Sequence, residues 1–225
     1  MIIAITGTVS SGKSRVAAML AAAMQIESVD SDWLCRQLLQ PGLPAWCELR
    51  RRWNGRFFDA EGHLDRVCLR EAVFSEPEIR EALETLLHPR VREEVAVRWR
   101  KTSQMARHLL VEVPLLFETG WHGDFDYVVT VYAPAALSVA RTVMRDKVSM
   151  AQAESILALQ FSADEKAKRA DSVIDSSGTW AATAVQVSLL ARQLQRLGQD
   201  RREPSRNGLK KLDSQGLSTY KGRSD

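Results

Sequence analysis

The chain has 225 residues, a length that suits one globular domain or a core carrying small insertions. Its 45% of hydrophobic and 26% of charged residues exclude collagen-like, low-complexity and wholly disordered proteins. The net charge is +3, and residues 198–225 hold seven basic and four acidic side chains. The rest of the chain therefore has 24 side chains of each sign, and this neutral body argues against a nucleic-acid-binding protein.

Strands and helices are predicted to alternate along the first part of the chain. Residues 2–6 are apolar and mostly β-branched, which is typical of a buried parallel strand. A glycine-containing segment then ends at Ser14, and residues 15–24 are rich in alanine with a helical period. A short strand over 26–29 and a helix over 33–39 are expected next.

Ser75 and Glu78 have the spacing of a capping box, with a proline in the first turn of the helix that would follow. We therefore expect a helix that begins there and continues to about residue 86. The dipeptide His88-Pro89 predicts a break, because proline removes a helical hydrogen bond and its ring clashes with the preceding turn. A second helix is expected from there to about residue 100.

The second half of the chain predicts the same alternation. Strands are expected over 108–113, 127–132 and 172–175, and helices over 135–145, 149–161 and 180–197. Ser149 and Gln152 form a second candidate capping box. From residue 198 onward glycine, serine and charged residues dominate, so a flexible basic tail is expected over 198–225. The whole pattern predicts an α/β fold with a parallel sheet.

Cysteine content and hydropathy indicate the class of protein. The three cysteines are Cys35, Cys47 and Cys68. They are odd in number and form no C-x-x-C pair, so neither a disulfide framework nor a zinc site is predicted. The apolar start is too short for the core of a signal peptide, and no apolar run approaches the roughly 18 residues that span a bilayer. We therefore expect a cytoplasmic protein with no membrane partner.

Residues 7–14 read Gly7-Thr8-Val9-Ser10-Ser11-Gly12-Lys13-Ser14 and match the phosphate-binding motif G-x-x-x-x-G-K-[ST] between a strand and a helix. Glycines allow successive backbone N–H groups to surround a phosphate, and the following helix adds its positive end. Lys13 would reach the β- and γ-phosphates of ATP, and Ser14 would offer a hydroxyl to Mg²⁺. A glycine turn that merely contains a lysine is the alternative, but the context favours nucleotide binding.

Two carboxylates, Asp30 and Asp32, follow the second predicted strand. The carboxyl ends of neighbouring parallel strands line one crevice, so we expect this pair to face the phosphate loop. Asp32 could orient an attacking hydroxyl or accept its proton. Alternatively, it could cap the helix predicted from residue 33.

Arg141 and Arg145 lie four residues apart, on one face of a predicted helix. They could close over a triphosphate and neutralise charge on the transferred group, or they could form a solvated basic face. Lys166, Lys168 and Arg169 are expected to be surface charges or additional charges on a lid.

Glu112, near the end of the strand predicted over 108–113, could hold a metal-bound water or be an isolated polar residue. His88 is expected to be a structural histidine, with a contact to the acceptor substrate as the alternative. For both residues the sequence pattern leaves the two interpretations open.

Taken together, these motifs resemble the dephospho-coenzyme A kinases. The matching segments occur in the family's order across about residues 2–178. The phosphate motif alone is unspecific, whereas its combination with His-Pro and Pro-Leu-Leu-Phe-Glu is specific. The segments are 7–14, 29–32 with Arg36, 41–45, 62–66, 73–74, 87–89, 113–118, Arg141 with Arg145, Gln160, and 170–175.

The resemblance implies a three-layer P-loop kinase core over 1–197, with a helical acceptor-binding region over about 33–105 and a helical lid over about 141–165. It also implies that ATP, with Mg²⁺, phosphorylates the 3′-hydroxyl of dephospho-CoA in the last step of coenzyme A biosynthesis. By position, Asp32 matches the family's base or hydroxyl-orienting residue, and Arg141 matches the lid arginine at the phosphates.

The remaining residues are implied to bind the ligands rather than to take part in the chemistry. The phosphate loop, Arg145 and Ser176 would contact ATP, and Ser14 and Glu112 would contact Mg²⁺. The acceptor substrate would be contacted by Arg36, His88, Pro114 and Leu115. Three positions depart from the family pattern: Thr8 replaces a glycine, Glu112 a frequent aspartate, and Ser176 a familiar asparagine.

Other functions share the same core. A nucleoside-monophosphate or shikimate kinase would have the phosphate loop, but the His-Pro and Pro-Leu-Leu-Phe-Glu segments fit those kinases poorly. A P-loop ATPase would hydrolyse ATP without an acceptor. A regulatory nucleotide-binding module would bind ATP without turnover. No feature of the sequence predicts the oligomeric state.

Overall fold

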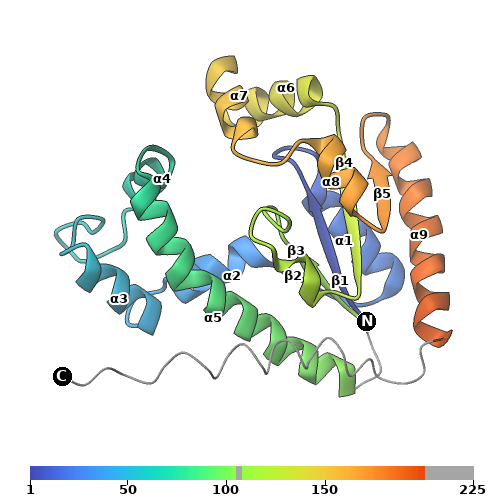
Figure 1. The fold of residues 1–225 in the computed structure, drawn as a ribbon, viewed down its shortest axis with the longest axis horizontal. Coiled ribbons are helices and arrows are strands. Elements are labelled where there is room, and N and C mark those ends of the chain that lie inside the picture. Colours follow the sequence, from blue (N-terminus) through green and yellow to red (C-terminus); the bar gives the residue numbers. More distant parts are fainter. Residues whose placement is uncertain (105–107, 201–225) are drawn as a thin grey trace. The chain divides into compact units, whose positions relative to one another are not determined.

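A computed structural model describes residues 1–104 and 108–200. The chain divides into two compact units, one formed by Met1–Asp30 with the residues from Arg98 onward, and the other by Ser31–Val97. Each unit has its own hydrophobic core. Their helices and strands are labelled in Figure 1.

The first unit contains a five-stranded parallel sheet in the order β2-β3-β1-β4-β5. Its strands are β1 (Ile2–Gly7), β2 (Glu27–Asp30), β3 (Leu109–Glu112), β4 (Tyr127–Tyr132) and β5 (Ser172–Asp175). All six residues of the central strand β1 are buried, which explains why its sequence is apolar without alternation. The predicted α/β fold with a parallel sheet is confirmed.

Helices cover both faces of this sheet (Figure 1). The helical elements of the first unit are α1 (Lys13–Met24), the short 3₁₀ helix Trp121–Asp124, α6 (Ala135–Asp146), α7 (Met150–Ala158), α8 (Ala163–Arg169) and α9 (Trp180–Asp200). Helices α1 and α9 bury apolar side chains such as Leu20 and Leu194 against Ile3 and Ile5 of β1. Helix α8 lies on the opposite face, where the hydroxyl of Thr130 in β4 donates to the Lys166 carbonyl at 3.1 Å.

The second unit is helical. It contains α2 (Ser31–Leu38), α3 (Pro44–Arg52), α4 (Arg66–Ser75) and most of α5 (Pro77–Gln104). Its core is centred on side chains such as Leu49 and Phe57, both fully buried. Helices α3 and α4 were not predicted.

Two sequence predictions about α5 are corrected. The expected break at His88-Pro89 is absent, because α5 continues through Pro89. The single hydrogen bond that proline removes is outweighed by a buried apolar face that includes Leu87 and Val91. Ser75 does not cap this helix: it is the last residue of α4, and its hydroxyl donates to the Glu71 carbonyl at 2.9 Å.

The capping box of Ser149 and Gln152 is confirmed at the start of α7, but that helix ends at Ala158 rather than at residue 161. The tail predicted from residue 198 begins too early, since residues 198–200 still belong to α9. Its remainder lies outside the described residues. In the part of the chain that is described, no helix combines the length and the apolar character needed to cross a membrane.

Leu194 and Leu189 of α9 provide a matched test of the core. The side chain of Leu194 is fully buried against the α1 face of the sheet, whereas that of Leu189 is 59% exposed. We expect Leu194→Ala to lower the free energy of unfolding by about 2–5 kcal/mol through lost burial and a residual cavity. Leu189→Ala should change it by less than about 0.5 kcal/mol in urea titrations. Equal losses in the two variants would contradict the packing of α9.

Candidate functional site

The phosphate loop connects β1 to α1 in a conformation that requires glycine at two positions. Gly7 has φ 152° and Gly12 has φ 89°, both in the region that glycine favours. A Cβ atom on Gly7 would collide with the Val131 carbonyl, and one on Gly12 would lie 2.8 Å from the Trp180 ring. The loop therefore packs closely against β4 and the start of α9.

The start of α1 carries positive potential. No side chain caps this helix within the described chain, and its first turn contains no acidic residue. Together with the helix dipole, the N–H groups at such a helix start favour an anion. Lys13 at the first position is 9% exposed, and its Nζ donates to the Thr8 carbonyl at 3.0 Å.

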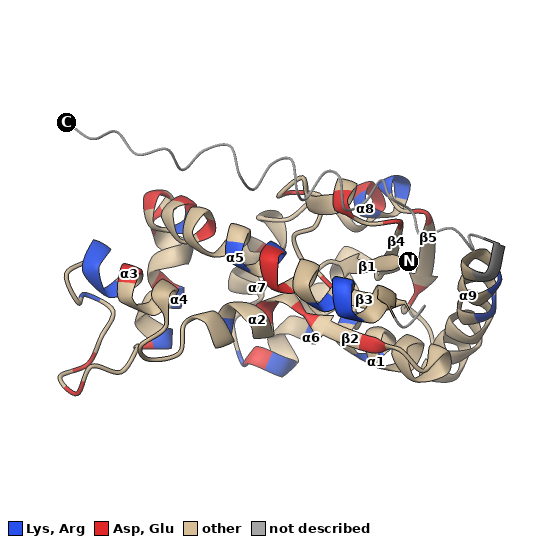
Figure 2. Ribbon diagram, turned by 90° about the horizontal axis from the view of Figure 1, so that it is seen from below, with Lys and Arg blue, Asp and Glu red and all other residues tan. Residues whose placement is uncertain are grey.

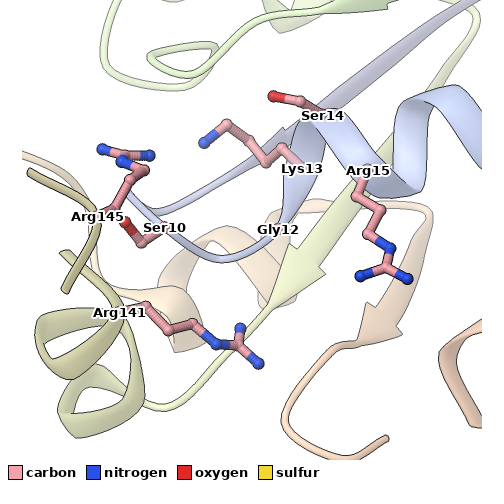
Figure 3. Close-up of a pocket in the computed structure, with 7 residues that line it drawn as sticks. All are labelled: Ser10, Gly12, Lys13, Ser14, Arg15, Arg141 and Arg145. Carbon is pink, nitrogen blue, oxygen red and sulfur yellow. The ribbon is translucent and has the colours of Figure 1, made fainter. Parts of the chain in front are cut away.

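A pocket of about 260 Å³ lies over this loop. Figure 3 shows its lining residues, which are Ser10, Gly12, Lys13, Ser14, Arg15, Arg141 and Arg145. Four of the seven are basic and none is acidic. The pocket thus brings together loop residues and the two arginines of α6 that the sequence singled out. Arg15 was not predicted, although its place directly after the motif was a usable signal.

Arg141 is oriented by Ser176. Its Nη2 donates to the Ser176 carbonyl at 2.7 Å, and its Nη1 lies 3.3 Å from the Ser176 hydroxyl. That hydroxyl is buried and donates toward the Ser11 carbonyl at 2.6 Å. Ser176 therefore connects the arginine to the phosphate loop. Arg145 instead pairs with its neighbour Asp146, with its Nε 2.8 Å from a carboxylate oxygen.

Ser14 and Glu112 meet at the carboxyl end of β3. The Ser14 hydroxyl donates to Glu112 Oε1 at 2.8 Å, and Glu112 is 7% exposed. A hydroxyl and a carboxylate side by side are hard oxygen donors and fit Mg²⁺. The described residues contain no cluster of three or more His, Cys, Asp or Glu side chains that could hold a metal ion. Water and phosphate oxygens would therefore complete the coordination shell.

Two hydroxyl pairs connect the loop to α6. The Thr8 and Ser138 hydroxyls lie 3.3 Å apart, and those of Ser10 and Thr142 lie 2.9 Å apart. The Thr142 hydroxyl can donate its one proton either to Ser10 Oγ or to the Ser138 carbonyl, which lies 2.8 Å away. Ser10 has φ 55°, so it is Ser10, rather than Thr8, that occupies a left-handed position.

The prediction that Lys166 is a surface or lid charge is wrong. Figure 2 shows acidic and basic residues close together on α8, but the side chain of Lys166 is fully buried. Its Nζ lies 2.8 Å from Glu118 Oε1 and donates to the Pro114 carbonyl at 2.7 Å. Burial lowers the pKa of Lys166 below its ordinary value, although Glu118 acts in the opposite direction.

The candidate acceptor residues fall into two groups. Asp32, Arg36 and His88 belong to the second unit. Asp32 is exposed and lies in the first turn of α2, which begins at Ser31, so it does not cap a helix starting at residue 33. Pro114 and Leu115 belong to the first unit and follow β3.

These two residues of the first unit hold the turn after β3 through their carbonyl groups. The Pro114 carbonyl accepts from the Thr6 hydroxyl at 3.1 Å as well as from Lys166. The Leu115 carbonyl accepts from the Thr119 hydroxyl at 2.8 Å. Backbone groups thus fix this turn next to the end of the central strand.

The family model described as dephospho-CoA kinase matches residues 1–182. The chain belongs to the dephospho-CoA kinase family. A dephospho-CoA kinase from Desulfotalea psychrophila is 35% identical over 83% of this chain and 94% of that protein. The family resemblance inferred from the sequence is confirmed, and this family member is a P-loop kinase and a transferase of coenzyme A biosynthesis.

Solved structures agree with this assignment. A protein from Thermus thermophilus matches with a TM-score of 0.74 and 32% identity, covering 87% of this chain and 97% of that one. The dephospho-CoA kinase from Campylobacter jejuni matches with a TM-score of 0.65 and 25% identity over the same shares. The matches therefore extend over most of the dephospho-CoA kinase fold.

His88 predicts a pH dependence of stability in this kinase. Burial lowers its pKa below the ordinary value of 6.5, although Glu84 raises it. Below pH 6.5 the unfolded state therefore binds more protons than the folded state, and stability is lost as the pH falls toward the lowered pKa. We expect His88→Gln to reduce this loss when urea unfolding is compared above and below pH 6.5. Identical pH profiles for both proteins would contradict the burial of His88.

Proposed function

We propose that this chain transfers the γ-phosphoryl group of ATP to the 3′-hydroxyl of dephospho-CoA. The observation that carries the proposal is the basic pocket, which is lined by the phosphate loop, the start of α1 and four cationic side chains. Such a site suits a triphosphate better than a neutral ligand, because charge on its oxygens is met from several directions. Membership of the dephospho-CoA kinase family supports the choice of acceptor.

The residues of the pocket would divide the work of holding ATP. Amides of the loop beyond Val9, whose own N–H donates to Gln160, would surround the phosphates. Lys13 would leave the Thr8 carbonyl to contact the β- and γ-phosphates. Arg141, with Arg145, would neutralise charge on the transferred group. Ser14 and Glu112 would hold Mg²⁺, which neutralises phosphate charge when bound. Ser176 would act through Arg141 on the nucleotide side.

Asp32 would act on the acceptor. It follows β2 by two residues, and the last residue of β2, Asp30, pairs in register with Glu112. Its carboxylate would orient the 3′-hydroxyl and accept the proton as the new O–P bond forms and ADP leaves. We propose further acceptor contacts for Arg36, His88, Pro114 and Leu115.

The proposed domain organisation follows the same division. The helical unit Ser31–Val97 would bind the acceptor, and α6 with α7 would form the lid that closes over ATP. Both substrates are soluble small molecules, so we propose a cytoplasmic enzyme with no nucleic-acid or membrane partner.

An acceptor-dependent assay of ADP release tests the function. We expect dephospho-CoA to stimulate ADP release from ATP, and the product to carry a new phosphate on the 3′-oxygen. AMP and shikimate should give no stimulation. Stimulation by either of these, or ATP hydrolysis that no acceptor changes, would assign the chain a different activity.

The same assay with Asp32→Asn tests the role of the carboxylate. This change keeps the shape of the side chain and removes the proton acceptor, so turnover should fall about 10²–10⁴-fold while ATP affinity is retained. If Asp32→Asn turned over at a rate close to that of the unmodified protein, Asp32 would not be the proton acceptor.

Arg141→Ala tests the arginine of the pocket. Loss of a cation that acts on the transferred group should lower kcat on the order of 10³-fold or more. Arg192→Ala, on the exposed side of α9, serves as a control for the loss of one positive charge. Steady-state kinetics distinguish a transition-state role of Arg141 from a role in ATP binding alone. A change confined to the KM for ATP would show that Arg141 only binds ATP in the ground state.

A further inference from the structure

Lys166 and Glu118 form a buried ion pair on the face of the sheet opposite α1. The Lys166 side chain is fully buried and that of Glu118 is 14% exposed. The lysine Nζ lies 2.8 Å and 3.1 Å from the two carboxylate oxygens, and it also donates to the Pro114 carbonyl. Such a pair is costly to desolvate and is therefore weak evidence for stability, so we look for its role in what it contacts.

The carboxylate has a further partner, which lies in the segment between α7 and α8. Glu118 Oε1 accepts from the Phe161 backbone N–H at 2.8 Å. Residues 159–162 connect α7, which ends at Ala158, to α8, which begins at Ala163. The Gln160 N–H donates to the Leu157 carbonyl at 3.1 Å, and Ser162 caps α8, so the Phe161 N–H lies between the two helix ends. The charged acceptor therefore holds the middle of this connection, between the end of α7 and the Ser162 cap of α8.

The neighbouring residue in this connection contacts the phosphate loop. Gln160 Oε1 accepts from the Val9 backbone N–H at 2.9 Å. Contacts thus run without a gap from Lys166 to Glu118, from Glu118 to Phe161, and through Gln160 to Val9. All of these residues belong to the first unit.

We propose that Lys166 and Glu118 are positioning residues, whose ion pair fixes the 159–162 connection and thereby holds Gln160 on the Val9 amide. Gln160 satisfies an N–H at the rim of the loop, so the amides that follow can keep the conformation that receives phosphate. A displacement of about 1 Å at such a site is enough to cost on the order of 10²-fold in rate. The kinetic consequence rests on the proposed function, whereas the structural one does not.

Amide hydrogen exchange at Val9, measured by NMR on the full chain, tests the structural consequence. Gln160→Leu removes the acceptor and should accelerate exchange at Val9 on the order of tenfold or more. Lys166→Met should do the same, although it lies outside hydrogen-bonding contact with Val9. When Gln160→Leu and Lys166→Met are combined, their effects on the exchange rate at Val9 should not add, because both changes break the same chain of contacts. Lys168→Met, an exposed lysine of the same helix, is the matched control and should leave exchange unchanged.

A second variant separates positioning from folding. Lys166→Met leaves Glu118 as an unpaired charge and could unfold the protein, whereas Lys166→Met with Glu118→Leu replaces the pair by apolar side chains of similar size. We expect this double variant to keep its free energy of unfolding and still to lose protection at Val9. A stable double variant with native exchange at Val9 would overturn the proposal.

Kinetics supply the last readout. The variant that combines Lys166→Met with Glu118→Leu should lower kcat about tenfold or more, with a smaller change in the KM for ATP. Both constants are measured well below the melting temperature of this variant. Native kcat together with lost protection at Val9 would overturn the positioning role. If the unmodified chain itself showed no acceptor-dependent turnover, the proposed function would fail, while the exchange experiment would still decide how Gln160 is held.

Discussion

The phosphate loop has to present free amides to a ligand and yet keep one conformation, and this constraint organises the first unit. Amides that bind an anion cannot also be satisfied inside the loop, where the Ser11 N–H donates to the Thr8 carbonyl at 3.2 Å, so further rigidity has to come from other segments. Side chains from residues 138–176 provide it. The contacts are Thr8 with Ser138, Val9 with Gln160, Ser10 with Thr142, and Ser11 with Ser176.

The parts of this arrangement that could be predicted from the sequence have local determinants. The strand at 2–6, the loop at 7–14 and the helix after it follow from the order of apolar, glycine and alanine-rich residues. The capping box of Ser149 and Gln152 needs only four residues. Arg141 and Arg145 could be paired because helical geometry fixes the faces of residues four apart. In each case the residues that determine the feature lie close together in the sequence.

The parts that could not be predicted depend on partners far away in the chain. Lys166 sits in a polar helix, and nothing around it indicates that Glu118, 48 residues earlier, encloses its charge. The continuity of α5 through Pro89 depends on packing in the second unit, which outweighs one lost hydrogen bond. The left-handed backbone of Ser10 could not be recognised either, since serine has no preference for positive φ and its partner Thr142 belongs to a distant helix.

The pairing of the central strand has a consequence for how the protein folds. Ile2 pairs with Leu109, and Ile3 with Tyr127, so the most buried strand has both neighbours roughly a hundred residues further along the chain. During synthesis this apolar segment leaves the ribosome long before either neighbour exists. High contact order of this kind slows folding and prolongs the exposure of an unpaired hydrophobic edge. The strand that carries the phosphate loop therefore has no strand partner until the chain has been synthesised past residue 109.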